Sequence, residues 1–324
     1  MGLKSWIQNL RKKDPQQGSE KKKDAKKAAS DKPRLYKWVR ITFVVLFWLF
    51  LLSPYMGLFG MLWVASKDDL PSTEELEDPQ MLLASEVYSA DGVLLGKYYS
   101  ENRTYIGYND ISRHVFDCLI ATEDERFYEH SGIDVKALGR VAEGVIKNDQ
   151  SSGGGSTISQ QLAKNLFKTR KKRYEESDRD ELNDEEEESG TIGKILRLAR
   201  YKFKEWLLAL EIEKKYSKDE IATMYLNTFD FLYNAVGIYS ASRVYFNTTP
   251  DSLRIEQAAM LVGMAKNPSL FNPMRDSTKA IQRRNIVLGQ LLRNSENPAV
   301  QHPITQAEFD SLKQLPIGLD YRRV

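Results

Sequence analysis

Glu123 and Asp124 are adjacent carboxylates at the end of an apolar stretch, and Phe127, His130 and Asp134 follow them closely. A carboxylate at a helix end beside an aromatic ring can take a proton from a weakly acidic group, which is the chemistry of a general base. An acidic pair by itself is more often a solvated turn. His130 fits a hydrogen-bonded structural role better than the role of a base.

The glycine-rich run SSGGGSTISQQLAKN (residues 151–165) suits the binding of an anion. Ser156 or Thr157 can cap the helix expected over 158–167, and a glycine turn that opens a helix presents N–H groups to a phosphate. The nucleotide-binding pattern GxxxxGK[ST] is absent. A flexible turn before an ordinary amphipathic helix is the alternative. The side chains expected on the polar face of this helix are Gln160, Gln161 and Lys164.

A third cluster belongs to a long helical stretch further along the chain. On a helical wheel Arg197, Tyr201 and Glu205 lie on one side, and Lys202 lies beside Glu205. Arg200 points elsewhere. A basic cluster around one acid could hold a diphosphate and a divalent cation such as Mg²⁺ or Mn²⁺. Surface ion pairs explain the same spacing equally well.

The segments before and after these candidate residues show the apolar spacing of helices. On either side of Asp91 and Gly92, apolar and polar residues alternate. This pattern predicts a β-hairpin with a two-residue turn. We therefore expect a mainly α-helical domain with one small hairpin. Apolar residues recur at three- and four-residue spacing over 111–121, 133–146, 158–167, 195–213, 218–226, 255–265 and 278–292.

A charge-free segment, Ile41–Ser66, follows a basic N-terminal region. It is longer than the roughly 20 residues that a membrane-spanning helix needs. A cleaved signal peptide, the alternative, has an apolar core of only about 7–15 residues. By the positive-inside rule the basic flank stays cytoplasmic and the chain after Lys67 lies outside. The sequence thus predicts a single-pass membrane protein with an external domain.

Composition excludes other classes of site. The chain carries 47 basic and 45 acidic side chains, a formal net charge of +2, which argues against a uniformly basic nucleic-acid binder. One cysteine, Cys118, and three histidines exclude a cysteine-rich metal site and an internal disulfide. We predict no resident metal site from the sequence.

These features divide the chain into consecutive segments. Within the main domain, residues 169–193 are strongly acidic, and we expect a mobile solvated loop there because like charges repel. The predicted segments are a cytoplasmic basic tail (1–35), a transmembrane anchor (36–66), a linker (67–80), the catalytic domain (81–300) and a C-terminal extension or linker (301–324).

In order and spacing, the motifs resemble those of one family, the peptidoglycan glycosyltransferases of family 51. Its members are the transglycosylase domains of class A penicillin-binding proteins and the monofunctional transglycosylases. The resemblance covers about residues 80–295. The segments that match the family signatures are Glu123–Asp134, Gly155–Asn165, Tyr201–Glu205, Lys218–Asn227 and Arg283–Leu288.

The resemblance implies a lysozyme-like, mainly helical fold and an inverting, processive glycosyl transfer on lipid II in the bacterial inner membrane. Glu123 would deprotonate the acceptor hydroxyl while polyprenyl diphosphate leaves the donor, and Glu205 would organise the diphosphate side. Further partners would be the growing lipid-linked glycan and other cell-wall synthesis proteins. The implied substrate-binding residues are Asp124, Ser156, Gln161, Lys164, Asn165, Arg197 and Lys202.

The chain departs from the family pattern at Tyr201, where relatives carry arginine, and at Leu232, where they usually carry glycine. Neighbouring aromatic residues, Phe229, Phe231 and Tyr233, are expected to pack in the core rather than to touch lipid headgroups. The transpeptidase motif KTG is absent, and SxxK occurs only at Ser19–Lys22. These residues therefore indicate no acyl transfer, and the chain is either monofunctional or the front part of a longer protein.

Two other functions remain open at this point. A muramidase or lytic transglycosylase also uses a glutamate on glycan, and a non-catalytic membrane scaffold needs no site at all. The cations Lys164, Arg197 and Lys202 distinguish these possibilities, since a diphosphate leaving group needs them and a neutral glycosidic leaving group does not.

Overall fold

The computed structural model describes residues 36–53, 55–57, 59–60, 63–64, 66, 85–91, 94–98, 104–147, 154–167 and 190–321. The chain divides into two compact units, Met1–Met61 and Leu62–Val324. In the first unit, the helix Tyr36–Ser53 has a mean hydropathy of 1.5, and none of its residues is buried. Its length and composition are sufficient to cross a membrane, and it is the one such helix among the described residues.

The second unit begins with a hairpin of strands β1 (Ser85–Tyr88) and β2 (Leu94–Tyr98), which pair antiparallel. The register pairs Ser85 with Tyr98 and Tyr88 with Leu94, with an irregularity between Val87 and Tyr88. Strand β1 ends at Tyr88 and β2 begins at Leu94, and Gly92 of the predicted two-residue turn lies outside the described residues.

The rest of this unit is helical, as the periodicity predicts. All seven predicted helices are present, and two helices, α10 and α13, were not predicted. The elements are η1 (Tyr108–Asp110), α4 (Arg113–Glu123), α5 (Val135–Lys147), α6 (Ile158–Leu166), α8 (Gly190–Lys215), α9 (Lys218–Thr228), α10 (Gly237–Phe246), η3 (Pro250–Ser252), α11 (Ile255–Ala265), α12 (Ser277–Arg293) and α13 (Gln306–Leu312).

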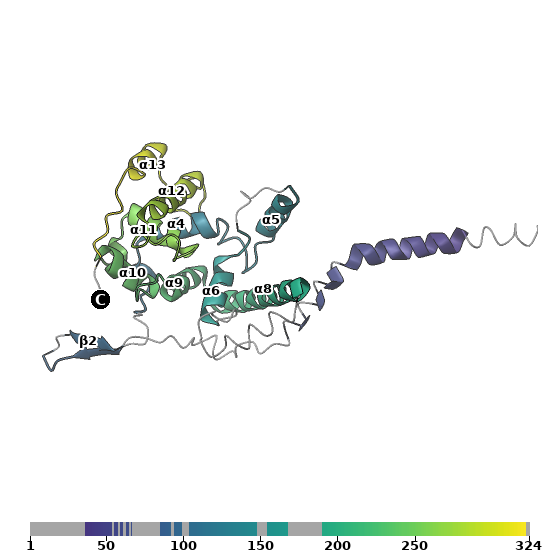
Figure 1. Ribbon diagram of the computed structural model, residues 1–324, viewed down its shortest axis with the longest axis horizontal. Helices are drawn as coiled ribbons and strands as arrows, with labels where there is room; N and C mark the ends of the chain where they lie inside the picture. Colours follow the sequence, from purple (N-terminus) through teal and green to yellow (C-terminus); the bar gives the residue numbers. More distant parts are fainter. Residues whose placement is uncertain are drawn as a thin grey trace, which may run out of the picture. The chain divides into compact units, whose positions relative to one another are not determined.

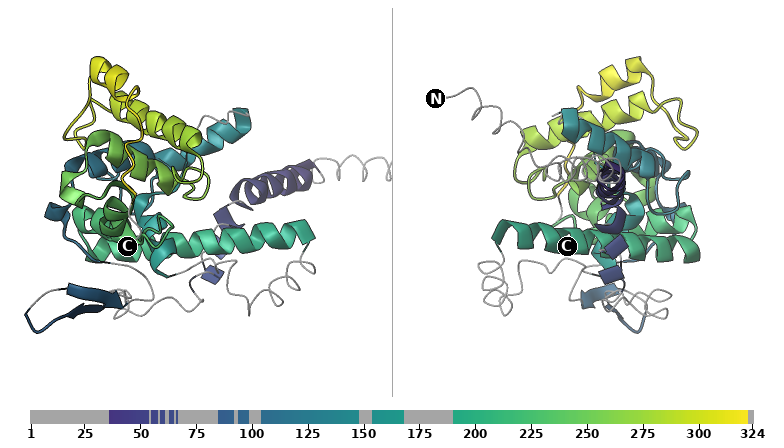
Figure 2. Two further views of the ribbon diagram at one scale, coloured as in Figure 1. Left: turned by 60° about the vertical axis from the view of Figure 1, so that its left-hand side comes forward. Right: turned by 90° about the vertical axis from the view of Figure 1, so that its right-hand side faces the viewer.

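The helices of this unit form two packed groups. Helices α4, α11 and α12 pack against one another, and α6 packs against both α8 and α9. Figures 1 and 2 show the first group above the second. Helix α11 is apolar on nearly all sides and its residues from 256 to 264 are buried, so it forms the centre of the first group. The carboxyl end of α4 faces the start of α6, where the two groups meet.

The segment after residue 300, predicted as an extension or linker, packs on this domain where it is described. Val300 and Ile304 are buried. The guanidinium of Arg284, a fully buried side chain, donates to the carbonyl oxygens of Lys313, Leu315 and Pro316. These bonds fix the chain after α13 against α12.

The loop between α9 and α10 has an unusual backbone. Leu232, Tyr233 and Asn234 all have positive φ, at 65°, 54° and 61°. Gly237, with φ of 80°, ends the loop where a Cβ atom would lie 2.6 Å from the carbonyl oxygen of Asn227. The position at which relatives usually carry glycine is therefore left-handed in this chain, which strains a leucine.

The aromatic residues of this loop divide between core and surface. Phe231 is buried and Phe229 packs against the core, as predicted. Tyr233 is 44 % exposed, contrary to the prediction. The left-handed backbone at its tip turns this side chain away from the core.

Most of the predicted acidic insertion (169–193) lies outside the described residues, which resume at residue 190. Helix α8 begins at Gly190, so residues 190–193 are helical rather than part of a loop.

Candidate active site

Glu123, the proposed base, is the last residue of α4 and lies where α4, α6 and α12 approach one another. The amide of Gln161 on α6 donates to its Oε2 atom at 2.9 Å, and Nη2 of Arg283 on α12 lies 3.7 Å from Oε1. The Glu123 side chain is 15 % exposed. The carboxylate is thus oriented by one hydrogen bond and one ion pair, and it is still reachable from solvent.

Arg283 was not among the residues selected from the sequence, although it opens the fifth matching motif. Its Nε donates to the carbonyl oxygen of Gly263, and its guanidinium lies 5.8 Å from the ring centroid of Phe271. Burial lowers the pKa of Arg283, and the negative charge of Glu123 opposes that shift. The buried guanidinium supplies positive charge directly behind the proposed base.

Asp124 turns inward from the same helix end. Its Oδ2 accepts the backbone N–H of Ile158 at 3.1 Å, and both carboxylate oxygens lie 3.0 Å from Nε2 of His130. Asp124 is buried and holds the start of α6 against the end of α4. The resemblance implies contact with substrate for this residue, whereas the geometry favours a positioning role.

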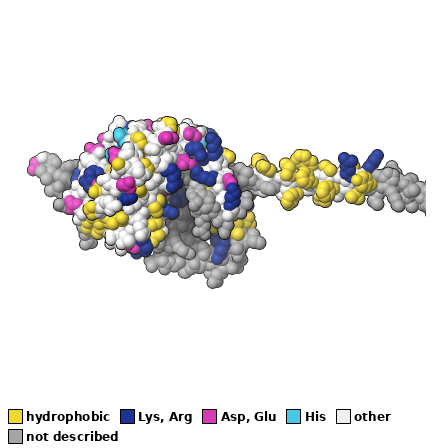
Figure 3. Space-filling model, turned by 90° about the horizontal axis from the view of Figure 1, so that it is seen from above, with side chains coloured by type: hydrophobic (Ala, Val, Ile, Leu, Met, Phe, Trp, Pro, Cys, Tyr) yellow, Lys and Arg dark blue, Asp and Glu magenta, His cyan; other side chains and the backbone are white. Residues whose placement is uncertain are grey.

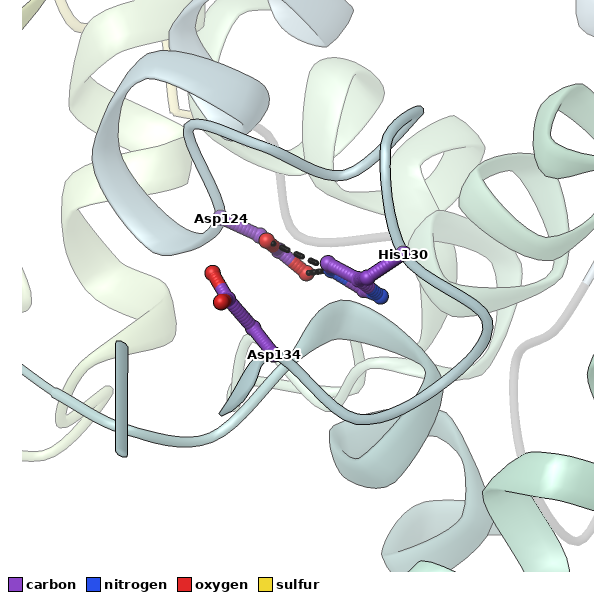
Figure 4. Close-up of side chains that lie close together, drawn as sticks. All are labelled: Asp124, His130 and Asp134. Carbon is purple, nitrogen blue, oxygen red and sulfur yellow. Dashed lines mark hydrogen bonds and ion pairs between the residues drawn. The ribbon is translucent and has the colours of Figure 1, made fainter. Parts of the chain in front are cut away.

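Asp124, His130 and Asp134 form a compact cluster at this helix junction (Figure 4). Their ligand atoms lie within 4.8 Å of one another, and this is the one such group among the described residues. Arg126 bonds the Asp134 carboxylate at 2.6 Å, and the N–H of Ala137 donates to it at 2.9 Å.

The hydrogen bonds within this cluster decide whether it could hold a metal. Burial raises the pKa of Asp134, but the bonds from Ala137 and Arg126 outweigh that effect and hold it below its usual value. Its carboxylate already faces a cation, and Asp124 faces His130 and a backbone donor. The donor set therefore fits a hydrogen-bonded structural cluster better than a metal site. The structural role expected for His130 agrees with this arrangement.

The glycine-rich run leads into α6 as predicted, with Thr157 as the cap. Its Oγ1 accepts the N–H of Gln160 at 3.2 Å and donates to the carbonyl oxygen of Gly132 at 2.7 Å. Gln160 does not lie on the polar face. It is 1 % exposed, and its amide donates to the same carbonyl of Gly132. Two side chains thus satisfy one buried backbone oxygen.

The outer face of α6 presents the remaining predicted residues of that helix. Gln161, Lys164 and Asn165 are partly exposed. Lys164 follows Gln161 by three residues and so lies on the same side of the helix. Among the described residues, no carboxylate forms an ion pair with Lys164.

Lys202 joins the glycine-rich run to α8. Its Nζ donates to Oγ of Ser156 at 2.8 Å and lies 3.1 Å from Oε2 of Glu205. Glu205 is only 2 % exposed, so its charge requires this cation. Arg197 lies two turns before Glu205 and Tyr201 lies one turn before it, and both side chains are partly exposed. Arg200 is exposed. That Arg197 and Tyr201 face the site stays a prediction.

A pocket of about 470 Å³ connects Glu123 to Ser156. Its lining is mostly polar and includes three basic residues that the sequence did not single out, although Arg140 and Lys147 share one face of α5 at a spacing of seven. Figure 3 shows Lys and Arg side chains gathered around a hollow on one face of the molecule. The basic residues of the lining are Arg140, Lys147 and Arg293.

Comparison with known proteins identifies similar chains. Residues 91–292 match the family model described as Transglycosylase. Penicillin-binding protein 1A of Escherichia coli is 34 % identical over 252 residues, covering 78 % of this chain and 26 % of the relative. The protein of the same name from Pseudomonas aeruginosa is 33 % identical over 288 residues, covering 89 % and 30 %. That from Aquifex aeolicus is 35 % identical over 263 residues, covering 78 % and 33 %.

The chain thus spans a third or less of the length of these curated relatives. Among solved structures, penicillin-binding protein 1A from Haemophilus influenzae matches with a TM-score of 0.36 and 19 % identity, over 75 % of this chain and 22 % of that one.

Proposed function

The chain belongs to the transglycosylase family, and from this premise we propose that it is a peptidoglycan glycosyltransferase that polymerises lipid II into glycan strands. The observation that carries this proposal is the setting of Glu123. Its carboxylate is held by Gln161 and Arg283 at the edge of a polar pocket that also reaches Ser156.

In the proposed reaction Glu123 takes the proton of the 4-hydroxyl of the acceptor GlcNAc. A sugar hydroxyl is a very weak acid, so its attack requires a base within hydrogen-bond reach. The acceptor oxygen then bonds to C1 of the donor MurNAc while the bond from C1 to the diphosphate oxygen breaks. The anomeric configuration inverts, and polyprenyl diphosphate leaves.

The leaving diphosphate gains negative charge, which the cationic side of the site would neutralise. Lys202 is already fixed by Glu205 and Ser156, and preorganised charge stabilises a transition state without reorganisation. We propose that Lys164 and Arg197 add further positive charge, and that Asn165 lines the same region. Glu205 acts here by orienting Lys202.

The same cations favour the transferase over its alternatives. A muramidase or lytic transglycosylase releases a neutral sugar hydroxyl and gains nothing from Lys164 or Lys202. A non-catalytic scaffold has no need of a buried Glu205 paired with Lys202, because such a pair contributes little stability by itself.

Incubation of the full chain with labelled lipid II tests this function. We expect wild type to make lipid-linked polymer and Glu123→Gln to lose at least about a hundredfold in rate, the lower range for removing a general base. Glu211→Gln is the matched control, because Glu211 pairs with Lys214 at a solvent-exposed position of the same helix as Glu205. Equal polymer from wild type and Glu123→Gln would refute the role of Glu123. Shortened glycan without lipid-linked product would identify a hydrolase.

We propose that Mg²⁺ or Mn²⁺, where it contributes, arrives with the substrate diphosphate rather than on a preformed protein site. The carboxylates of Asp124 and Asp134 and the Nε2 atom of His130 are already engaged, and Glu205 is a single carboxylate bound to Lys202. Chelation followed by readdition of either ion should then change the rate of polymerisation without changing the melting temperature of the protein alone. A fall in melting temperature on chelation would instead indicate a resident metal.

We also propose that the helix Tyr36–Ser53 anchors the chain in the bacterial inner membrane with its basic flank in the cytoplasm. The Lys-rich sequence before it and the positive-inside rule support this orientation. Protease added to intact spheroplasts should degrade the domain after Lys67 and spare the N-terminal tail. The opposite pattern of protection would reverse the orientation.

A further inference from the structure

Tyr225 on α9 lies in the core beneath the site, and its hydroxyl points to the proposed base through one intermediate side chain. The residue is 1 % exposed, and its ring packs 6.0 Å from that of Phe229. Its hydroxyl bonds Oε1 of Gln161 at 3.1 Å. The other end of the same amide donates to Glu123 at 2.9 Å. A chain of two hydrogen bonds therefore crosses from α9 through α6 to α4.

The direction of these bonds follows from the chemistry of the three groups. A carboxylate only accepts, so Gln161 must turn its NH₂ group toward Glu123 and its carbonyl oxygen toward Tyr225. That oxygen is an acceptor, so the phenol donates. The two hydrogen bonds thus determine which way the Gln161 amide faces. The shape of the amide does not, because its oxygen and nitrogen ends look alike.

The phenol remains a donor throughout the working pH range. Burial raises the pKa of Tyr225 well above its usual value, and the negative charge of Glu123 raises it further. Tyr225 is also enclosed by its surroundings, because every residue of α9 from 221 to 228 is buried. The terminal torsion of a glutamine is broad, so the Gln161 amide would rotate freely without a fixed donor.

We propose that Tyr225 is a positioning residue for the proposed base: by donating to Gln161 it fixes the amide that orients the Glu123 carboxylate. The inference rests on the proposed function, in which Glu123 accepts the acceptor proton. Tyr225 contacts neither substrate nor Glu123 directly. Its effect on the reaction therefore passes through Gln161.

Tyr225→Phe tests the inference because it removes one hydroxyl and keeps the ring. In polymerisation of lipid II by the full chain, we expect kcat to fall about tenfold, the scale of one hydrogen bond in a charged network. KM should stay within about twofold, since no substrate contact is lost. Tyr245→Phe is the matched control. Tyr245 is equally buried and bonds Phe231 and Asn272 away from Glu123, so its loss should leave kcat unchanged.

A double-mutant cycle separates positioning from a general loss of packing. In a Gln161→Met background, which already lacks the amide, Tyr225→Phe should change kcat by less than about twofold. An equal loss of kcat in both backgrounds, or wild-type kcat for Tyr225→Phe, overturns the inference. Should Tyr225→Phe fail to fold, Gln161→Met alone decides, because wild-type kcat for that variant also overturns it.

The Glu123→Gln variant distinguishes the two levels of the argument. Polymer formation at the wild-type rate by Glu123→Gln refutes the proposed function itself. An inactive Glu123→Gln together with a fully active Tyr225→Phe refutes only the positioning role of Tyr225.

Discussion

The Nζ atom of Lys202 lies 3.1 Å from Oε2 of Glu205, three residues further along α8. The same ammonium group donates to Ser156 in the loop that opens α6, so one ion pair connects two separate segments of the site. Glu205 is almost completely buried, and a buried carboxylate is tolerated only when it is paired. The pair therefore fixes both the charge on α8 and the position of the glycine-rich loop.

Substitution of Lys202 should separate its effect on stability from its effect on activity. Lys202→Met removes the cation and should lower the free energy of unfolding by about 2 kcal/mol, less than for a fully buried pair because Lys202 is 28 % exposed. Adding Glu205→Gln should recover most of the lost free energy of unfolding, because the buried charge is then gone. Polymerisation should remain impaired in the double variant. Recovery of activity together with stability would show that the pair is only structural.

The contact between Arg283 and Glu123 leads to a second prediction. Arg283→Lys keeps the positive charge but cannot hold Gly263 and face Glu123 with one planar group. We expect kcat to fall by about tenfold in Arg283→Lys and further in Arg283→Met, as the electrostatic support of the proposed base is weakened and then lost. Steady-state kinetics with lipid II measure this. Arg275→Lys, at an exposed position, is the control.

Asp134 should make stability depend on pH. Its pKa lies below the usual 3.8 in the folded chain, because bonds from Ala137 and Arg126 outweigh the effect of burial. A lowered pKa contributes stability above pH 3.8, and this is lost as the pH falls through the folded value. Asp134→Asn should therefore cost about 1–3 kcal/mol near pH 7 and clearly less at an acidic pH below the folded pKa of Asp134. Urea unfolding at both pH values measures the difference, and an equal cost at both would contradict this account.

Arg284 should control the segment that follows α13. The guanidinium is fully buried and reaches three backbone carbonyl oxygens through two separate nitrogens, Nη1 and Nη2, whereas lysine has a single nitrogen at its end. We expect Arg284→Lys to lower the free energy of unfolding by about 2 kcal/mol. Hydrogen exchange at residues 313–317 should accelerate more than in α11. Unchanged exchange in that segment would mean that other contacts hold it.

Much of the fold follows from apolar periodicity. The helix predicted over 255–265 has those bounds in the structure, because most positions between them are apolar. The start of α6 follows from Thr157, a capping residue directly before an apolar run. Helix α10 was not predicted because it begins at Gly237, after a left-handed loop and without a side-chain cap. Tertiary contacts rather than local signals define its start.

The candidate site was only partly predictable for a different reason. Sequence patterns place polar residues outward, yet Gln160 and Asp124 point inward to satisfy Gly132 and Ile158. Such bonds join segments that are far apart in the chain. Arg283 was missed for the same reason, since it lies 160 positions beyond the Glu123 that it faces. Neither a helical wheel nor local spacing reports such contacts.

The departure at Leu232 leads to the last prediction. Leu232 adopts φ of 65° and is the first of three successive left-handed residues, so its Cβ atom adds strain that glycine would avoid. A left-handed residue other than glycine costs roughly 1–2 kcal/mol, and glycine loses more entropy on folding. Leu232→Gly should therefore raise the free energy of unfolding by about 0.5–1 kcal/mol, measured by urea unfolding. Asn234→Gly should change it less, because asparagine tolerates this conformation better than leucine does. A destabilised Leu232→Gly would mean that packing of the leucine side chain outweighs the strain of its backbone.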